Sequence, residues 1–186
     1  MIAQKGWTLD AFDNMRRLDS FMLETCRHKP LADIVLVRKC VRSTTLSDGT
    51  TLSPGVLVSA ARAPRALDER FYPRANEFDG MRFYDTAERF SDADKTPPRN
   101  LSFGAGKHAW YSLSSRIPAT ASLLLTPVYC SPGRFFATAI IKASVATLLT
   151  KYELLPGSKE QMEISFEETR LSSMKAKISL RPLELT

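Results

Sequence analysis

The stretch LDSFMLETCR, residues 18–27, decides how the rest of the sequence is interpreted. Its apolar positions recur at the spacing of one helical face. They are Leu18, Phe21, Met22 and, at the edge of the face, Thr25. The pattern predicts a helix over residues 9–28, with Thr8 as its N-cap, Asp10 in its first turn and Pro30 ending it.

Two charged residues of this helix, Glu24 and Arg27, are three positions apart. That spacing brings their side chains together on one face of a helix. An exposed pair of this kind contributes only a few tenths of a kcal/mol, about 0.2–0.5, so the pair alone indicates no function.

The composition is that of an ordinary folded protein, and it excludes whole classes of chain. The 186 residues are 44% apolar and 25% charged, which excludes collagen-like and fully disordered proteins. Three cysteines, Cys26, Cys40 and Cys130, are too few for a secreted disulfide scaffold. The net charge of +6 is spread among acidic residues, most evenly over residues 62–89, so we expect no nucleic-acid site.

Downstream of the first helix, short strands and a second helix predict an α+β fold. Residues 34–41 suit a strand, and Asp48-Gly49 and Pro54-Gly55 mark turns of a small antiparallel sheet. Residues 61–101 show no sustained period. A second helix should follow Pro132 and end by Pro156-Gly157, and alternating segments near residues 162–166 and 174–181 should be strands.

Candidate motifs for catalysis or metal binding are weak when taken singly. FGAGKHA, residues 103–109, matches a dinucleotide-binding loop loosely but lacks the flanking strand and helix that such a loop needs. Cys26, His28, Cys40 and His108 do not form the paired spacing of a zinc site, which favours ordinary thiols. The sequence contains the residues for a nucleophilic pair of His108 with Cys26 or Cys130, but no local motif supports such a pair.

Four segments in a fixed order together resemble the C-terminal part of a cytochrome P-450 of fungal type, a heme-thiolate monooxygenase. They are LDSFMLETCR (18–27), FYPRANEFDGMRFYD (71–85), LSFGAGKHA (101–109) and PGRFFATAIIK (132–142). The first resembles the K helix of that family, with its Glu-x-x-Arg pair, and the second resembles the segment whose arginine joins that pair. The last two resemble the two halves of the heme-binding loop and the L helix behind it.

The resemblance implies roles for individual residues. Glu24, Arg27 and Arg82 would form a structural cluster that holds the irregular segment, the meander of the family, and would not be catalytic. Cys130 would be the axial ligand of the heme iron, with Phe103 and Gly106 shaping the loop and His108 near a heme propionate. Residues just after Pro30 and the turn near Thr169 would border the substrate.

The heme-binding loop departs from the family pattern at residues 110–131. Where the family has cysteine after Ala109 stands Trp110, and Ser131 separates Cys130 from Pro132-Gly133. This stretch holds one charged residue, Arg116. We expect it to be a retained intron, because its end codons can contain splice signals and joining its flanks restores the loop FGAGKHACPGRFF. In the chain as written, Cys130 is either the heme ligand or a free thiol.

As a whole, residues 1–186 would be a single partial cytochrome P-450 domain. The resemblance implies heme and iron binding, a small hydrophobic substrate and an NADPH-dependent reductase as electron donor. Members usually reside in the endoplasmic reticulum membrane, but the chain shows no membrane anchor and its own location stays unknown. The alternatives are a catalytically inactive fragment of a truncated or mis-spliced gene and a small basic interaction domain.

Overall fold

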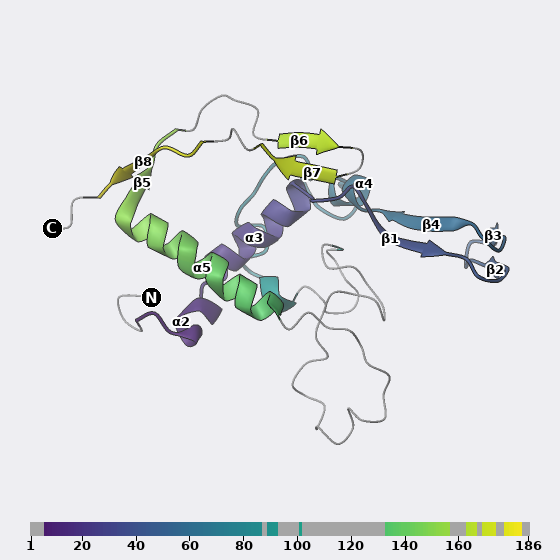
Figure 1. Ribbon diagram of the computed structural model, residues 1–186, viewed down its shortest axis with the longest axis horizontal. Helices are drawn as coiled ribbons and strands as arrows, with labels where there is room; N and C mark the ends of the chain where they lie inside the picture. Colours follow the sequence, from purple (N-terminus) through teal and green to yellow (C-terminus); the bar gives the residue numbers. More distant parts are fainter. Residues whose placement is uncertain are drawn as a thin grey trace, which may run out of the picture.

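The computed structural model describes residues 6–86, 89–92, 101, 133–156, 163–166, 169–173 and 177–183. Two longer helices, two short ones and four two-stranded antiparallel sheets make up this part of the chain, which confirms the α+β class. In Figure 1, α5 crosses α3, while the β1–β4 ribbon extends away from both helices. The helices are α2 (Leu9–Asp13), α3 (Arg16–His28), α4 (Arg62–Ala66), α5 (Gly133–Lys151) and the 3₁₀ turn η1 (Phe90–Asp92).

The expected single helix over residues 9–28 is wrong, because the structure has two helices there. Thr8 caps α2 as predicted, accepting a hydrogen bond of 3.2 Å from the Ala11 N–H, and Asp10 lies in the first turn. Asn14 ends α2, since its side-chain amide donates to the Asp10 carbonyl at 2.7 Å. Asparagine favours such local bonds over continued helix, and α3 therefore starts anew at Arg16.

The buried face of α3 matches the predicted apolar face only in part, since it includes Met22 but also charged residues. Phe21 is half exposed, whereas Asp19, Glu24 and Arg27 are almost completely buried. Charged residues are rarely buried unless they are paired, so this helix face must be satisfied by charges from other elements.

The strands after α3 form two small sheets, as expected. The first pairs β1 (Ile34–Lys39) with β4 (Leu57–Ala61), and the second pairs β2 (Thr44–Thr45) with β3 (Thr51–Leu52). The Asp48 carboxylate caps the β2–β3 turn by accepting from the Thr50 N–H at 2.9 Å. Gly55, at the second predicted turn, has φ of +91°, which is the left-handed region that favours glycine.

The segment expected to be irregular carries one short helix, α4, and is otherwise turns from residue 67 to residue 86. Its aromatic residues enter the core. Tyr72 and Phe83 pack with Ala75 against Leu23 of α3, and Phe90 of η1 borders this cluster. The core is therefore built between one helix and a segment that lacks regular hydrogen-bond ladders.

The second long helix, α5, begins at Gly133 as Pro132 predicted, but it ends at Lys151 and not at Pro156. A strand, β5 (Tyr152–Leu154), follows directly and pairs with β8 (Leu180–Pro182). The last sheet pairs β6 (Glu163–Phe166) with β7 (Thr169–Ser172). The strand expected over residues 174–181 is much shorter: residues 174–176 lie outside the described part of the chain, residues 177–179 are not in a strand, and β8 begins only at Leu180. Among the described residues, no helix has the length and apolar character needed to cross a membrane.

Candidate functional site

Glu24 and Arg27 of α3 form a two-point ion pair inside the protein. Arg27 Nε lies 2.7 Å from Glu24 Oε2, and Arg27 Nη2 lies 2.8 Å from Glu24 Oε1. The side chain of Glu24 is 0% exposed and that of Arg27 is 2% exposed. The pair is thus a buried fork-to-carboxylate contact, much stronger than the exposed pair its spacing alone would suggest.

Arg82 joins the same carboxylate from the segment after α4. Its Nε lies 3.1 Å and 3.2 Å from the two oxygens of Glu24. The backbone N–H of Asp79 donates to Glu24 Oε1 at 2.9 Å. The structure therefore brings together Glu24, Arg27 and Arg82, the three residues assigned to a structural cluster.

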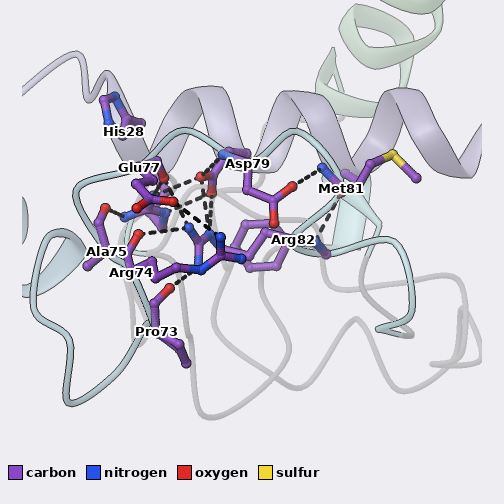
Figure 2. Close-up of polar contacts among 12 residues, drawn as sticks. His28, Pro73, Arg74, Ala75, Glu77, Asp79, Met81 and Arg82 are labelled. Atoms are coloured by element: carbon purple, nitrogen blue, oxygen red, sulfur yellow. Dashed lines mark hydrogen bonds and ion pairs between the residues drawn. The ribbon is translucent and has the colours of Figure 1, made fainter.

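The two guanidinium groups also bind backbone carbonyls of the irregular segment (Figure 2). Arg27 donates to the carbonyls of Ala66 at 2.5 Å, Ala75 at 2.7 Å and Glu77 at 3.2 Å. Arg82 donates to those of Pro73 at 2.6 Å, Arg74 at 3.1 Å and Glu77 at 3.0 Å. Side-chain donors thus replace the helix or sheet ladder that these carbonyls lack.

The electrostatics of the cluster keep Glu24 ionised. Burial of the carboxyl acts to raise its pKa, but the hydrogen bonds from Arg27, the Asp79 N–H and Arg82 outweigh burial and hold the pKa below its ordinary value. With four N–H donors on its two oxygens and no exposed surface, the carboxylate has no free position for a substrate. The cluster can organise the fold but cannot transfer a proton to a ligand.

The residues assigned to heme binding, Phe103, Gly106, His108 and Cys130, all lie outside the described residues, as does the predicted insertion 110–131. The other two cysteines, Cys26 and Cys40, form no disulfide within the described part of the chain and are partly buried. Within the described part of the chain, no group of three or more His, Cys, Asp or Glu side chains could hold a metal ion.

Cys130 stands shortly before helix α5 in the sequence. Helix α5 starts at Gly133, three residues after Cys130, and its first turn holds no acidic residue. The N-terminal end of a helix favours negative charge and lowers the pKa of a nearby thiol. A cysteine ahead of a helix start is a residue type that fits the sulfur ligand of a heme iron.

The two segments expected to border the substrate meet in space. Ala32 forms an isolated β-bridge with Thr169, and the Arg170 N–H donates to the Leu31 carbonyl at 2.8 Å. The side chain of Arg170 forms an ion pair of 3.0 Å with Asp33. Residues 137 to 139 positions apart in the chain thus form one edge.

A second buried ion pair, between Asp19 of α3 and Lys142 of α5, was missed by the sequence interpretation. No local pattern links residues 123 positions apart. One signal was available: Lys142 is the only charged residue between Phe135 and Thr150. A lone lysine in an apolar helix is buried only when it is paired, so a partner carboxylate could have been sought.

Comparison with known proteins gives the family. A sequence model described as cytochrome P-450 matches residues 1–109. Cytochrome P-450 monooxygenase 71 of Postia placenta is 35% identical over 158 residues, which cover 83% of this chain and 28% of that protein. Cytochrome P-450 monooxygenase ptmQ of Penicillium ochrochloron is 30% identical over 190 residues, which cover 98% of this chain and 33% of that protein. The chain spans about a third of the length of these relatives.

Solved structures show the same fold. The crystal structure of the cytochrome P-450 CYP102L1 gives a TM-score of 0.62 at 19% identity, covering 94% of this chain and 33% of that one. A retinoic acid-bound cyanobacterial CYP120A1 gives 0.60 at 21% identity, covering 94% and 34%. Members of this family are heme-thiolate proteins. The family match over residues 1–109, which include the Glu24 cluster, shows that this chain belongs to the cytochrome P-450 family.

Proposed function

We propose that this chain is a heme-binding part of a fungal-type monooxygenase. The observation that carries the proposal is the buried cluster of Glu24, Arg27 and Arg82, which is fully formed in a chain that belongs to the family. The cluster fixes the segment of residues 66–82 against α3, and the heme-binding loop follows that segment in the sequence.

Cys130 is the proposed axial ligand, and the start of α5 three residues later in the sequence would favour its thiolate form. Phe103 and Gly106 are proposed to shape the loop beside the sulfur, and His108 is proposed to contact a heme propionate. When bound, the heme supplies the activation of dioxygen for insertion into a substrate. This chain would hold the heme and orient its sulfur ligand.

For partners we propose an NADPH-dependent reductase as electron donor and a small hydrophobic substrate. The net charge of +6 supports attraction to an acidic donor protein. The edge formed by Ala32 and Thr169 is the proposed border of the substrate site.

Residues 110–131 are proposed to be an insertion, the translation of a retained intron. Two observations support this: the family match ends at Ala109, and the stretch carries a single charged residue, Arg116. Sequencing the transcript tests it directly. We expect most messages to lack the codons of this stretch and to read FGAGKHACPGRFF, and a message that retains the stretch in most copies would contradict the proposal.

The test of heme binding is the Soret absorption of the chain after heme is added, reduced and exposed to carbon monoxide. Three proteins are compared: the chain as written, its Cys130→Ser variant, and a form in which a single cysteine replaces residues 110–131. We expect a thiolate-type band that is lost in Cys130→Ser and strongest in the joined form, since closing a 22-residue loop costs free energy.

Cys40→Ser is the matched control, because Cys40 forms no disulfide with a described residue and lies beside the β1–β4 sheet, where no heme contact is proposed. It should leave the spectrum unchanged. If the joined form shows the thiolate band and the chain as written does not, the written chain is the inactive fragment. If neither form shows it, the proposal of heme binding fails.

A further inference from the structure

We propose that Asp19 and Lys142 are positioning residues that fix the register of α5 on α3, and so the direction in which α5 presents its N-terminus to the proposed heme ligand. The proposal rests on the proposed heme-binding function for its consequence, but not for its geometry. Lys142 Nζ lies 2.8 Å from both carboxylate oxygens of Asp19. The side chain of Asp19 is 0% exposed and that of Lys142 is 4% exposed.

The Lys142 ammonium, which has three N–H donors, meets three oxygen atoms at this site. Its Nζ donates to Asp19 Oδ2 at 2.8 Å and to the Phe12 carbonyl of α2 at 2.9 Å, and it lies 2.8 Å from Asp19 Oδ1. Asp19 also accepts from the Phe90 N–H of η1 at 3.2 Å, and Arg89 Nη1 lies 4.0 Å from Asp19 Oδ2. One buried contact therefore joins four elements: α2, α3, η1 and α5.

Apolar packing alone would leave the placement of α5 loosely determined. Between Phe135 and Thr150 the helix offers apolar or small residues on all sides apart from Lys142, and Phe136, Ile140 and Leu149 stay exposed among the described residues. If α5 moved along its axis by one turn, or rotated about its axis by one residue, one apolar contact would replace another. The buried ammonium allows no such exchange, because any other register leaves Lys142 and Asp19 as unpaired buried charges.

The pair acts at a defined distance from the start of the helix. Lys142 lies nine residues after Gly133, about 13 Å along the axis at about 1.5 Å per residue. A helix is stiff over that length, so a fixed rotation at Lys142 fixes the rotation at Gly133. Cys130 precedes Gly133 by three residues, and placement errors of about 1 Å already matter for a reacting centre.

The experiment separates positioning from stabilisation. Asp19→Asn with Lys142→Met in one chain removes both charges of the pair and leaves only the partly exposed Arg89 without its carboxylate, so much of the stability should be kept. Spin labels on ketone-bearing residues at positions 17 and 144, both exposed, report the distance between α3 and α5 by electron paramagnetic resonance in the full chain. Lys151→Met is the matched control, because Lys151 lies on the same helix and is exposed.

We expect one narrow distance population in the unsubstituted chain and in Lys151→Met. In the double variant we expect the population to broaden or shift by up to one helical turn, about 5.4 Å, while the helical circular dichroism is retained. With heme added, the thiolate-type fraction of the bound heme should fall at least about twofold in the double variant.

A narrow, unshifted population in the double variant would overturn the positioning role and leave the pair a contribution to stability only. A broad population in the unsubstituted chain would overturn it as well. The heme result is read separately: a narrow distance population without any thiolate signal in the unsubstituted chain refutes the proposed function and leaves the register assignment in place.

Discussion

Helix α3 carries two completely buried carboxylates, and the structure satisfies them in different ways. Glu24 is bound by two arginines, and these donate six hydrogen bonds to backbone carbonyls of the irregular segment. This carboxylate therefore anchors a stretch of chain without regular structure. Asp19 is bound by one lysine from α5, so it anchors a helix that is already regular. The Glu24 contact determines the conformation of the irregular segment, and the Asp19 contact determines the position of α5.

The largest expected effect comes from Glu24→Gln. Without the carboxylate charge, Arg27 is a buried cation with no counter-ion, and breaking a buried pair in this way costs on the order of 3–5 kcal/mol. The free energy of unfolding, measured by urea denaturation with circular dichroism, should fall by that amount. Glu77→Gln is the control, because Glu77 pairs with Arg74 on the surface, and it should change the free energy by less than about 1 kcal/mol. Equal effects of the two substitutions would show that the cluster is not the anchor.

Acidification should remove the difference in unfolding free energy between the unsubstituted chain and Glu24→Gln. Because the pKa of Glu24 is held below its ordinary value of 4.5, the stabilisation by its ionised form is complete above that value and is lost as pH falls through the lower, folded-state pKa. The unfolding free energies of the unsubstituted chain and of Glu24→Gln should therefore converge as the solution is acidified below pH 4.5. A difference that stays constant down to the acid-unfolding range would assign the effect of Glu24→Gln to lost shape and not to lost charge.

Removing both partners should distinguish the two carboxylates. Asp19→Asn with Lys142→Met leaves only Arg89 near the site, and Arg89 is 31% exposed and can turn to water. Glu24→Gln with Arg82→Met still leaves Arg27 buried and without its carboxylate. The free energy of unfolding is measured by urea denaturation for each single and double variant. We expect the Asp19/Lys142 double variant to be about 2 kcal/mol more stable than the sum of its single substitutions predicts, and the Glu24/Arg82 double variant to show a smaller gain. The reverse order would mean that the carbonyl contacts of Arg27 suffice to stabilise its charge.

The two carboxylates also differ in how far the sequence reveals them. Glu24 and Arg27 are visible as a helical i,i+3 pair, and the ordered segments add Arg82 by family resemblance. Asp19 lies on the same helix, but its partner is 123 residues away, and no periodicity connects them. The apolar spacing of Leu18, Phe21 and Met22 matched the buried face only at Met22, because it could not include buried charges whose partners lie elsewhere.

The same reasoning explains the errors in the secondary structure. Thr8, Pro30, Asp48-Gly49 and Pro132 act locally, and the elements they delimit begin or end as predicted. The break between α2 and α3 depends on one side-chain bond of Asn14, and the early end of α5 at Lys151 coincides with pairing of β5 to the distant β8. The β5–β8 pairing is a tertiary contact that a local reading of the chain cannot reveal, whereas the Asn14 bond is local and was overlooked in favour of the apolar periodicity.

The smallest expected effect tests the outermost support of the Asp19 contact. Thr8→Ala removes the cap of α2, which should cost about 1 kcal/mol or less and fray the helix whose Phe12 carbonyl accepts from Lys142. Amide hydrogen exchange should become faster in α2 and, to a smaller extent, around Lys142, because the ammonium loses one of its three fixed acceptors. Thr25→Ala is the control, since the Thr25 hydroxyl bonds the Phe21 carbonyl within α3 and touches neither carboxylate site. If Thr8→Ala speeds exchange in α2 alone, Asp19 suffices to hold Lys142, and the contact with α2 is a consequence of the register of α5 and not a cause of it.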